Sequence, residues 1–418
     1  MILAKEVAGA AHPSMDAPLV QTCRHVWLTA PGPGALAVVR LFGPDALSLA
    51  DRVFRPSRQP ERPLSATPPR RPRLGRLGTF RSPTPTTPTG LTDNSDTHNH
   101  NHNRVEVGDE VVAIRFDDDP CQPSQVEFQG HGGLAARQAV EAILEAAGSR
   151  PVPARVWRIE TQGLTTIQAD AYDDLAYAPT RRTAAILLDQ ALGALDRDLD
   201  SLERLEADDP ACAADLRATL FQRFEVGSRL ISGWNVALAG RPNVGKSSLM
   251  NALAGHARAI VSPQAGTTRD VLTVPLACDG WPMTLFDTAG LRDQPSDDLE
   301  AQGILRARNA QTQADLVLLL LDSSQPLEPL DLALLHTYPN ALLVATKADL
   351  APHWRAEDLP TTRKLVSLSA LTGEGLDRLL DRLAQRLVPN PPPAGSAVPF
   401  RIDHLTQLNR TNRAKLSG

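Results

Sequence analysis

A glycine-rich stretch between an apolar run and a helical pattern constrains the fold of this chain most. Residues 240–247 read GRPNVGKS and fit GxxxxGK[ST], after a strand pattern at Asn235–Ala239 and before a helix expected at Ser247–Ala254. Glycines let backbone N–H groups wrap a phosphate, and a helix N-terminus adds partial positive charge. The stretch therefore predicts a nucleotide site in which Lys246 reaches the β- and γ-phosphates and Ser247 binds Mg²⁺. The other loop residues expected to contact the nucleotide are Asn243, Val244, Gly245 and Ser248.

Two further motifs follow the phosphate loop in order. Gly266–Asp270 reads GTTRD and places Thr267 and Thr268 where a switch loop can close over Mg²⁺ and the γ-phosphate. The expected strand Trp281–Phe286 leads into DTAG, in which Asp287 can hold the metal through water and the Gly290 N–H can meet the γ-phosphate. The next residue is leucine, where Ras-like enzymes carry the glutamine that orients the attacking water. We therefore expect a group in the acidic loop at 291–300 to orient the water.

The remaining motifs select the base. After the expected strand Leu342–Ala345 comes TKAD, in which Asp349 accepts the N1 and N2 donors of guanine and Lys347 lies across the ring. GTPases usually read NKxD here, so Thr346 loses an amide that ties the base loop to the phosphate loop, and we expect weaker binding of the same nucleotide. A strand at Leu365–Leu368 precedes Ser369 and Ala370, whose backbone can contact guanine O6. Five ordered motifs at strand ends predict a GTPase that binds GTP and GDP in a doubly wound, Ras-like α/β domain.

The composition predicts a soluble cytoplasmic protein. A net charge of −5 gives no overall attraction to nucleic acid, so any such contact needs a local basic patch. The four cysteines are far apart and predict no structural disulfide. No apolar run is long enough to span a membrane, and the N-terminus lacks a signal-peptide pattern. The alternating His98–His102 run offers metal ligands, but such a tract is more often solvent-exposed low complexity.

Shifts in composition predict five segments. A flexible stretch at 1–20 precedes an α+β domain at 21–150, which carries a mostly mobile, low-complexity insert at 56–104. Helical patterns fill 151–232, the GTPase domain spans 233–390, and 391–418 is a linker followed by one short helix. In the first domain we expect strands at Val26–Leu28, Leu36–Leu41, Leu74–Phe80, Glu110–Phe116 and Gln125–Gln129, with helices from Asp45 and at Leu134–Ala147; long helices are expected at Ala184–Leu205 and Ala213–Ile231.

Several of these stretches together resemble the tRNA-modification GTPase family MnmE, also called TrmE. The sequences GRPNVGKSSLMNAL, SPQAGTTRD and DTAGLRD…LEAQGI carry the resemblance in the GTPase domain. Outside it, TAPGPGALAVVRLFGPDAL resembles the family's N-terminal TPPGRGGIGIVRxSGP, and VEFQGHGG resembles VExxxHGG. The resemblance covers about 22–55, 105–180 and 230–410, and the nucleotide motifs are its most specific part.

The resemblance implies properties that the motifs alone do not give. It implies K⁺ bound between the phosphates by Asn243, with Ser262 and Thr267 as further ligands, and a water oriented by Glu300. It also implies a GTPase domain inserted in a helical domain, preceded by a small α+β domain that forms a homodimer and binds 5-formyl-tetrahydrofolate. The implied partners are an MnmG-like flavoprotein and tRNA, whose wobble uridine is modified, and no membrane is involved.

The chain also departs from the family pattern. The C-terminal Cys-Ile-Gly-Lys tail does not occur, and Asp119–Ser124 replaces the folate-associated FTGED stretch, which counts against folate binding. Arg40 and His131 can serve a ligand, although structural roles in a strand and a turn are favoured. These departures keep a second hypothesis open, in which the chain is a GTP-dependent regulatory or assembly switch without modification chemistry.

Overall fold

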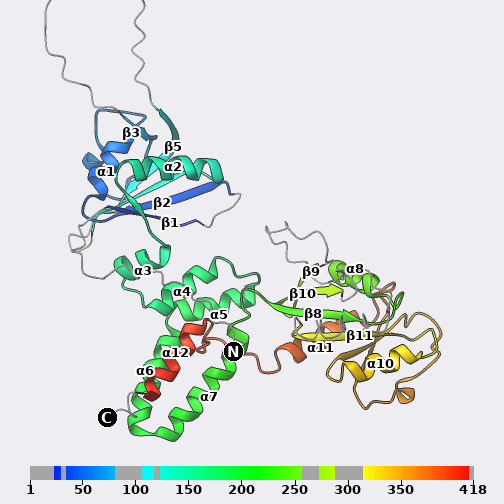
Figure 1. Ribbon diagram of the computed structural model, residues 1–418. Helices are drawn as coiled ribbons and strands as arrows, with labels where there is room; N and C mark the ends of the chain where they lie inside the picture. The colour runs from blue at the N-terminus through cyan, green and yellow to red at the C-terminus, as the bar shows by residue number, and fades with distance from the viewer. Residues whose placement is uncertain are drawn as a thin grey trace, which may run out of the picture. The chain divides into compact units, whose positions relative to one another are not determined.

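The computed structural model describes residues 23–29, 34–80, 106–116, 123–256, 273–287 and 314–413. The chain divides into two units, Met1–Leu164 and Thr165–Gly418, and each has its own β-sheet (Figure 1). No helix among the described residues combines the length and the apolar character that crossing a membrane requires.

The first unit is built on a seven-stranded sheet in the order β3-β4-β5-β6-β2-β1-β7. Its strands are mainly antiparallel, and α1 and α2 cover one face, because both helices share a buried core with β2, β4, β5 and β6 (Figure 1). Apolar residues of α1 recur at helical spacing, which gives that helix its buried side. The elements are β1 (Arg24–Trp27), β2 (Leu36–Phe42), α1 (Ala46–Val53), β3 (Phe54–Pro56), a 3-10 turn (Leu64–Ala66), β4 (Arg73–Thr79), β5 (Glu106–Arg115), β6 (Gln125–His131), α2 (Leu134–Ala146), β7 (Arg150–Pro151) and α3 (Ala154–Gln162).

Two expectations for this unit need correction. The expected insert at 56–104 has regular structure in its first part, because β4 pairs with β3 and with β5 and Leu64 and Leu77 are buried in the core. Gly75 permits the close pairing, since a Cβ there would lie 2.3 Å from the Arg55 carbonyl oxygen. The boundary expected at 150 is too early, because β7 pairs with β1 and the buried Trp157 of α3 packs on Val26 and Phe42.

In the second unit, the described residues include five helices that do not pack on its sheet's two faces as α8, α10 and α11 do: α4 (Thr166–Leu175), α5 (Arg181–Ala191), α6 (Ala194–Asp208), α7 (Pro210–Gly227) and α12 (Ile402–Arg413). The single helix expected at Ala184–Leu205 is wrong, because the chain breaks at Gly193, whose φ of 84° lies in the left-handed region. The expected C-terminal helix is confirmed as α12. Arg401, just before it, contacts Asp174 at 2.7 Å, and Leu408 is fully buried.

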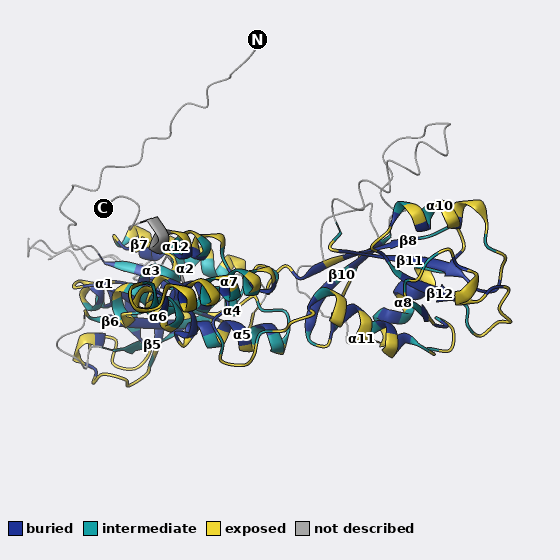
Figure 2. Ribbon diagram, turned by 90° about the horizontal axis from the view of Figure 1, so that it is seen from below, coloured by how far each residue is buried: buried dark blue, intermediate teal, exposed yellow. Residues whose placement is uncertain are grey.

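A six-stranded sheet forms the rest of the second unit, in the order β13-β12-β11-β8-β10-β9. All neighbours are parallel except β9 and β10. Successive residues of β11 point to opposite faces of the sheet. On one face they pack in a core shared with α8 and α11, and on the other face in a core shared with α10, so both faces of the sheet are buried (Figure 2). Its elements are β8 (Trp234–Ala239), α8 (Lys246–His256), β9 (Thr273–Cys278), β10 (Trp281–Asp287), β11 (Leu316–Asp322), α10 (Pro329–Thr337), β12 (Leu342–Thr346), β13 (Leu365–Ser367) and α11 (Leu376–Leu387).

The parallel strands determine where the sequence motifs meet. The carboxyl ends of β8, β10, β11, β12 and β13 lie along one edge of the sheet, because these strands run in the same direction. In open α/β sheets, ligands bind at this edge. The expected α/β sheet is thus confirmed, and it gathers the phosphate loop, Asp287, the TKAD loop and the Ser369 loop.

Candidate functional site

The phosphate loop joins β8 to α8 without regular structure. Gly240 and Gly245 have φ angles of 148° and 101°, and Asn243 also lies in the left-handed region, with φ of 63°. A Cβ on Gly240 would lie 2.7 Å from the Leu320 carbonyl oxygen, so glycine is required where the loop passes β11. Val244 is buried, whereas Asn243, Ser247 and Ser248 are exposed. The buried Val244 thus anchors the loop to the protein core, while the neighbouring polar side chains remain accessible to a ligand.

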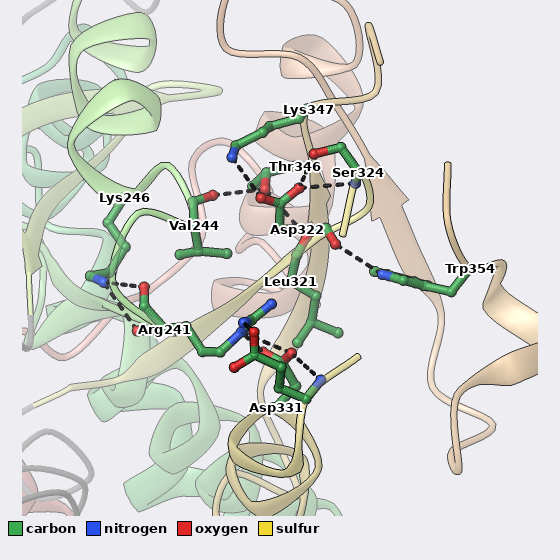
Figure 3. Close-up of polar contacts among 12 residues, drawn as sticks. Arg241, Val244, Lys246, Leu321, Asp322, Ser324, Asp331, Thr346, Lys347 and Trp354 are labelled. Atoms are coloured by element: carbon green, nitrogen blue, oxygen red, sulfur yellow. Dashed lines mark hydrogen bonds and ion pairs between the residues drawn. The ribbon is translucent and has the colours of Figure 1, made fainter. Parts of the chain in front are cut away.

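Lys246 is the first residue of α8, and its ammonium group turns back onto the loop. Its Nζ donates to the carbonyl oxygens of Gly240 at 3.0 Å and Arg241 at 2.9 Å (Figure 3). Burial lowers the pKa of Lys246, and the nearby Asp287 carboxylate opposes that shift. Asp287 ends β10 and pairs in register with Leu238 of β8, so it lies on the strand next to the phosphate loop.

Arg241 fixes the phosphate loop to the start of α10. Its guanidinium contacts the Asp331 carboxylate at 2.9 Å and also pairs with Glu328. The Asp331 side chain is only 1% exposed, and it also accepts a hydrogen bond from the Glu328 N–H (Figure 3). A buried carboxylate with two donors resists displacement. Sequence reasoning missed this pair, because nothing in the local pattern links the loop to α10.

Thr346 ties the base loop to the phosphate loop, contrary to the expectation that this connection is lost. Its Oγ1 donates to the Val244 carbonyl oxygen at 2.8 Å and lies 3.3 Å from that of Leu321 (Figure 3). Thr346 is buried, so the contact is protected from water. The Thr346 hydroxyl thus replaces the usual amide in joining the two loops, and weaker nucleotide binding is no longer expected from this substitution.

Asp322, at the end of β11, holds the lysine of the base loop. Lys347 has a left-handed backbone, with φ of 59°, and its Nζ contacts Asp322 Oδ2 at 2.6 Å. The other carboxylate oxygen accepts hydrogen bonds from the N–H and hydroxyl of Ser324 (Figure 3). Burial raises the pKa of Asp322, but the contacts with Lys347 and Ser324 outweigh it, and the net pKa is lowered. Sequence reasoning missed Asp322, which stood only as the last residue of an apolar strand.

The structure brings the two base-contact loops together. The Ala348 N–H donates to the Leu368 carbonyl oxygen at 3.0 Å, and Asp349 beside it is exposed. Ser369 is buried, and its hydroxyl accepts hydrogen bonds from the N–H groups of Leu371 and Thr372. These contacts shape the turn that carries Ala370. From the other side, Trp354 Nε1 donates to the Asp322 carbonyl oxygen at 2.9 Å.

Arg40 and His131, the two possible ligand-binding residues of the first unit, both contact other side chains of the protein. Arg40 pairs with Glu127 and lies over the rings of Phe116 and Trp157. His131 Nδ1 lies 2.8 Å from Asp109, and this contact raises the pKa of the exposed imidazole. Several expected site residues lie outside the described residues and are not placed: Ser262, Thr267, Thr268, Gly290 and Glu300, together with the run 98–102 and most of 119–124.

A phosphate loop and a TKAD base loop at the carboxyl edge of one parallel sheet define a P-loop GTPase domain. A sequence model of the 50S ribosome-binding GTPase family matches residues 235–347. A curated relative from Thermus thermophilus, the tRNA modification GTPase MnmE, is 35% identical over 392 residues and covers 86% of this chain and 81% of its own. Its counterpart from a second strain of that species is 37% identical over 393 residues, with 85% and 80% covered. The chain belongs to the MnmE family of tRNA modification GTPases.

Among solved structures, the G domain of the T. maritima FeoB iron transporter is 30% identical, covers 37% of this chain and 98% of its own, and has a TM-score of 0.28. The family and the domain together identify this chain as a guanine-nucleotide-binding GTP hydrolase that works with Mg²⁺. The donor set suits that ion, because Mg²⁺ prefers oxygen ligands and the chain offers a Ser247 hydroxyl at the start of α8 and an Asp287 carboxylate on the neighbouring strand.

Proposed function

We propose that this chain is an MnmE-type GTPase that hydrolyses GTP with K⁺ stimulation and acts in the modification of wobble uridine in tRNA. The observation that carries the proposal is the hydrogen bond from Thr346 to the Val244 carbonyl oxygen, which couples the guanine loop to the phosphate loop. Binding of the base then positions the phosphates, as a guanine-specific hydrolase requires. The family relationship supports the role in tRNA modification.

The described residues have the following roles in this proposal. Asp349 accepts hydrogen bonds from guanine N1 and N2, and Lys347, held by Asp322, covers the ring. Lys246 turns from the loop carbonyls to the β- and γ-phosphates. When bound, Mg²⁺ neutralises charge on these phosphates. Its proposed ligands are Ser247, Thr268 and Asp287, and the remaining nucleotide contacts are Asn243, Val244, Gly245, Ser248, Thr267, Thr346, Ser369 and Ala370.

The hydrolysis step uses residues proposed from the sequence. The Gly290 N–H donates to the γ-phosphate, and Glu300 orients the attacking water. Asn243, Ser262 and Thr267 bind K⁺, which supplies the positive charge that an arginine finger supplies elsewhere. The exposed Asn243, at a left-handed position of the loop, supports this role, because its side chain is not used inside the protein core.

We propose the family's domain arrangement for the whole chain. A small α+β domain precedes a helical domain, into which the GTPase domain is inserted, and α12 forms the returning part of the helical domain. The first unit forms a homodimer, and an MnmG-like flavoprotein and tRNA are the partners. Formyl-tetrahydrofolate is not part of this proposal, because Asp119–Ser124 replaces the folate-associated stretch.

Mass spectrometry of total tRNA from a strain lacking this gene tests the function. We expect loss of a wobble-uridine modification, restored by the wild-type gene and not by Asp287→Ala. Unchanged tRNA would contradict the role in modification and would favour a GTP-dependent switch.

The K⁺ requirement is tested on the purified full-length chain. We expect faster GTP turnover in KCl than in NaCl, and a loss of this difference in Asn243→Ala. Asn251→Ala, at an exposed position of α8, is the matched control and should keep the difference. Equal rates of the wild type in the two salts would contradict K⁺ binding.

A further inference from the structure

A hollow lies at the end of the GTPase sheet opposite to the carboxyl ends of its parallel strands, where the nucleotide motifs meet. It has a volume of about 480 Å³ and is lined by residues before and at the start of β12, by the residues that lead into β13, and by the second half of α11. The lining residues are Pro339, Asn340, Ala341, Leu342, Arg363, Lys364, Arg382, Gln385 and Arg386. We call it the basic groove.

The charged residues of the basic groove all have one sign. Four of its nine lining residues are arginine or lysine and none is acidic, in a chain whose net charge is −5. Arg363 is held by the carbonyl oxygens of Leu335 and Tyr338, so it contributes a fixed charge. The other three, Lys364, Arg382 and Arg386, are exposed, and in the part of the chain that the structure describes none of them is in an ion pair.

The helix α11 keeps its acidic residues away from the basic groove. Asp377 contacts His256 of α8 at 2.7 Å. Asp381 lies on the side near Cys278 of β9, where it adds to burial in raising the pKa of that thiol. Arg382 and Arg386 are one helical turn apart and project together from the other side of the buried leucine stripe. The positive charge of the groove is therefore not neutralised by the helix that carries it.

The chemistry of the lining favours one kind of ligand. Guanidinium groups donate paired hydrogen bonds that match phosphate oxygens. The lining contains no aromatic side chain on which a base could stack, so the groove suits a phosphate backbone and offers no platform for reading bases. Arg386 also lines a neighbouring hollow of about 880 Å³, where Asp315 pairs with Arg229 and Glu225 belongs to the lining, so the uniformly positive lining is confined to the basic groove.

We propose that the basic groove binds the phosphate backbone of tRNA through Lys364, Arg382 and Arg386. The inference rests on the proposed function for its choice of RNA. It places the RNA contact at the end of the domain opposite to GTP, so both ligands can bind at once.

Fluorescence anisotropy of a labelled tRNA transcript, titrated with the full-length chain at several KCl concentrations, tests the proposal. We expect a variant with Lys364, Arg382 and Arg386 all changed to alanine to bind at least tenfold more weakly. The slope of log affinity against log salt should fall by about three, because each phosphate contact contributes a slope of about one. The matched control changes Arg181, Arg197 and Arg204, three exposed arginines of the helices α5 and α6 outside the groove, and should keep the wild-type slope.

The possible outcomes separate this inference from the proposed function. GTP turnover of the variant should equal that of the wild type, which verifies the fold. Wild-type tRNA affinity in the groove variant, or no tRNA binding by the wild type, would overturn the inference. The tRNA analysis of the deletion strain would still decide the proposed function. If the groove variant kept its tRNA affinity and lost affinity for a polyglutamate peptide, the groove would be a site for an acidic protein, and this result would also overturn the inference.

Discussion

The hydrogen bond between Thr346 and the Val244 carbonyl oxygen gives the sharpest prediction. Thr346→Val keeps the shape of the side chain and removes its hydroxyl. The donor–acceptor distance is 2.8 Å and Thr346 is buried, so water does not replace the lost donor. Losing one buried hydrogen bond and leaving its acceptor unpaired costs about 1–2 kcal/mol.

That cost should appear mainly as weaker nucleotide binding. The bond joins the two loops that hold the base and the phosphates, and without it the nucleotide must order them itself. A loss of about 1–2 kcal/mol corresponds to a dissociation constant about 5–30-fold higher. Thr346→Asn, which restores the usual amide, should bind within about threefold of the wild type, because the amide can donate to the same carbonyl oxygen.

Titration of the full-length variants with a fluorescent GDP analogue in excess Mg²⁺ measures this effect. Thr219→Val removes a hydroxyl that bonds within α7, and it serves as the matched control. Thermal unfolding of each variant separates weaker binding from general destabilisation. A dissociation constant within twofold of wild type for Thr346→Val would refute the coupling of the two loops.

Two other predictions follow from the described side chains. Asp322→Asn removes the charge that holds Lys347, so GDP affinity should fall about fivefold. Asp279→Asn, at an exposed ion pair, is the control and should leave GDP affinity unchanged. An Asp322→Asn variant that binds GDP as tightly as the Asp279→Asn variant would contradict the role of Asp322. Burial of His25 lowers its pKa from 6.5 to about 4, so only the unfolded state takes up the proton as pH falls through this window. The free energy of unfolding should therefore drop by about 3 kcal/mol between pH 6.5 and pH 4, and His25→Gln should flatten this slope in urea titrations; the same slope in both proteins would rule out His25 as its source.

The sequence by itself determined the class of protein. The residues GRPNVGKS, TKAD and DTAG are local patterns, and each requires only a strand end and a loop to do its chemistry. The strand β11 could also be predicted from a local pattern, since a short continuous run of apolar residues is typical of a strand that is buried on both faces of a parallel sheet. These elements depend on neighbours in sequence, and neighbours in sequence are visible without a structure.

Only the tertiary structure decided which groups meet across the chain. The contacts of Thr346 with Val244 and of Arg241 with Asp331 depend on strand order and register, which bring distant segments to one edge of the sheet. The basic groove likewise combines residues that lead into β12 and β13 with residues of α11, and no single stretch of sequence contains them. Local patterns specify elements, whereas side-chain partners follow from the packing of those elements, because a partner's distance is fixed only when both segments are placed.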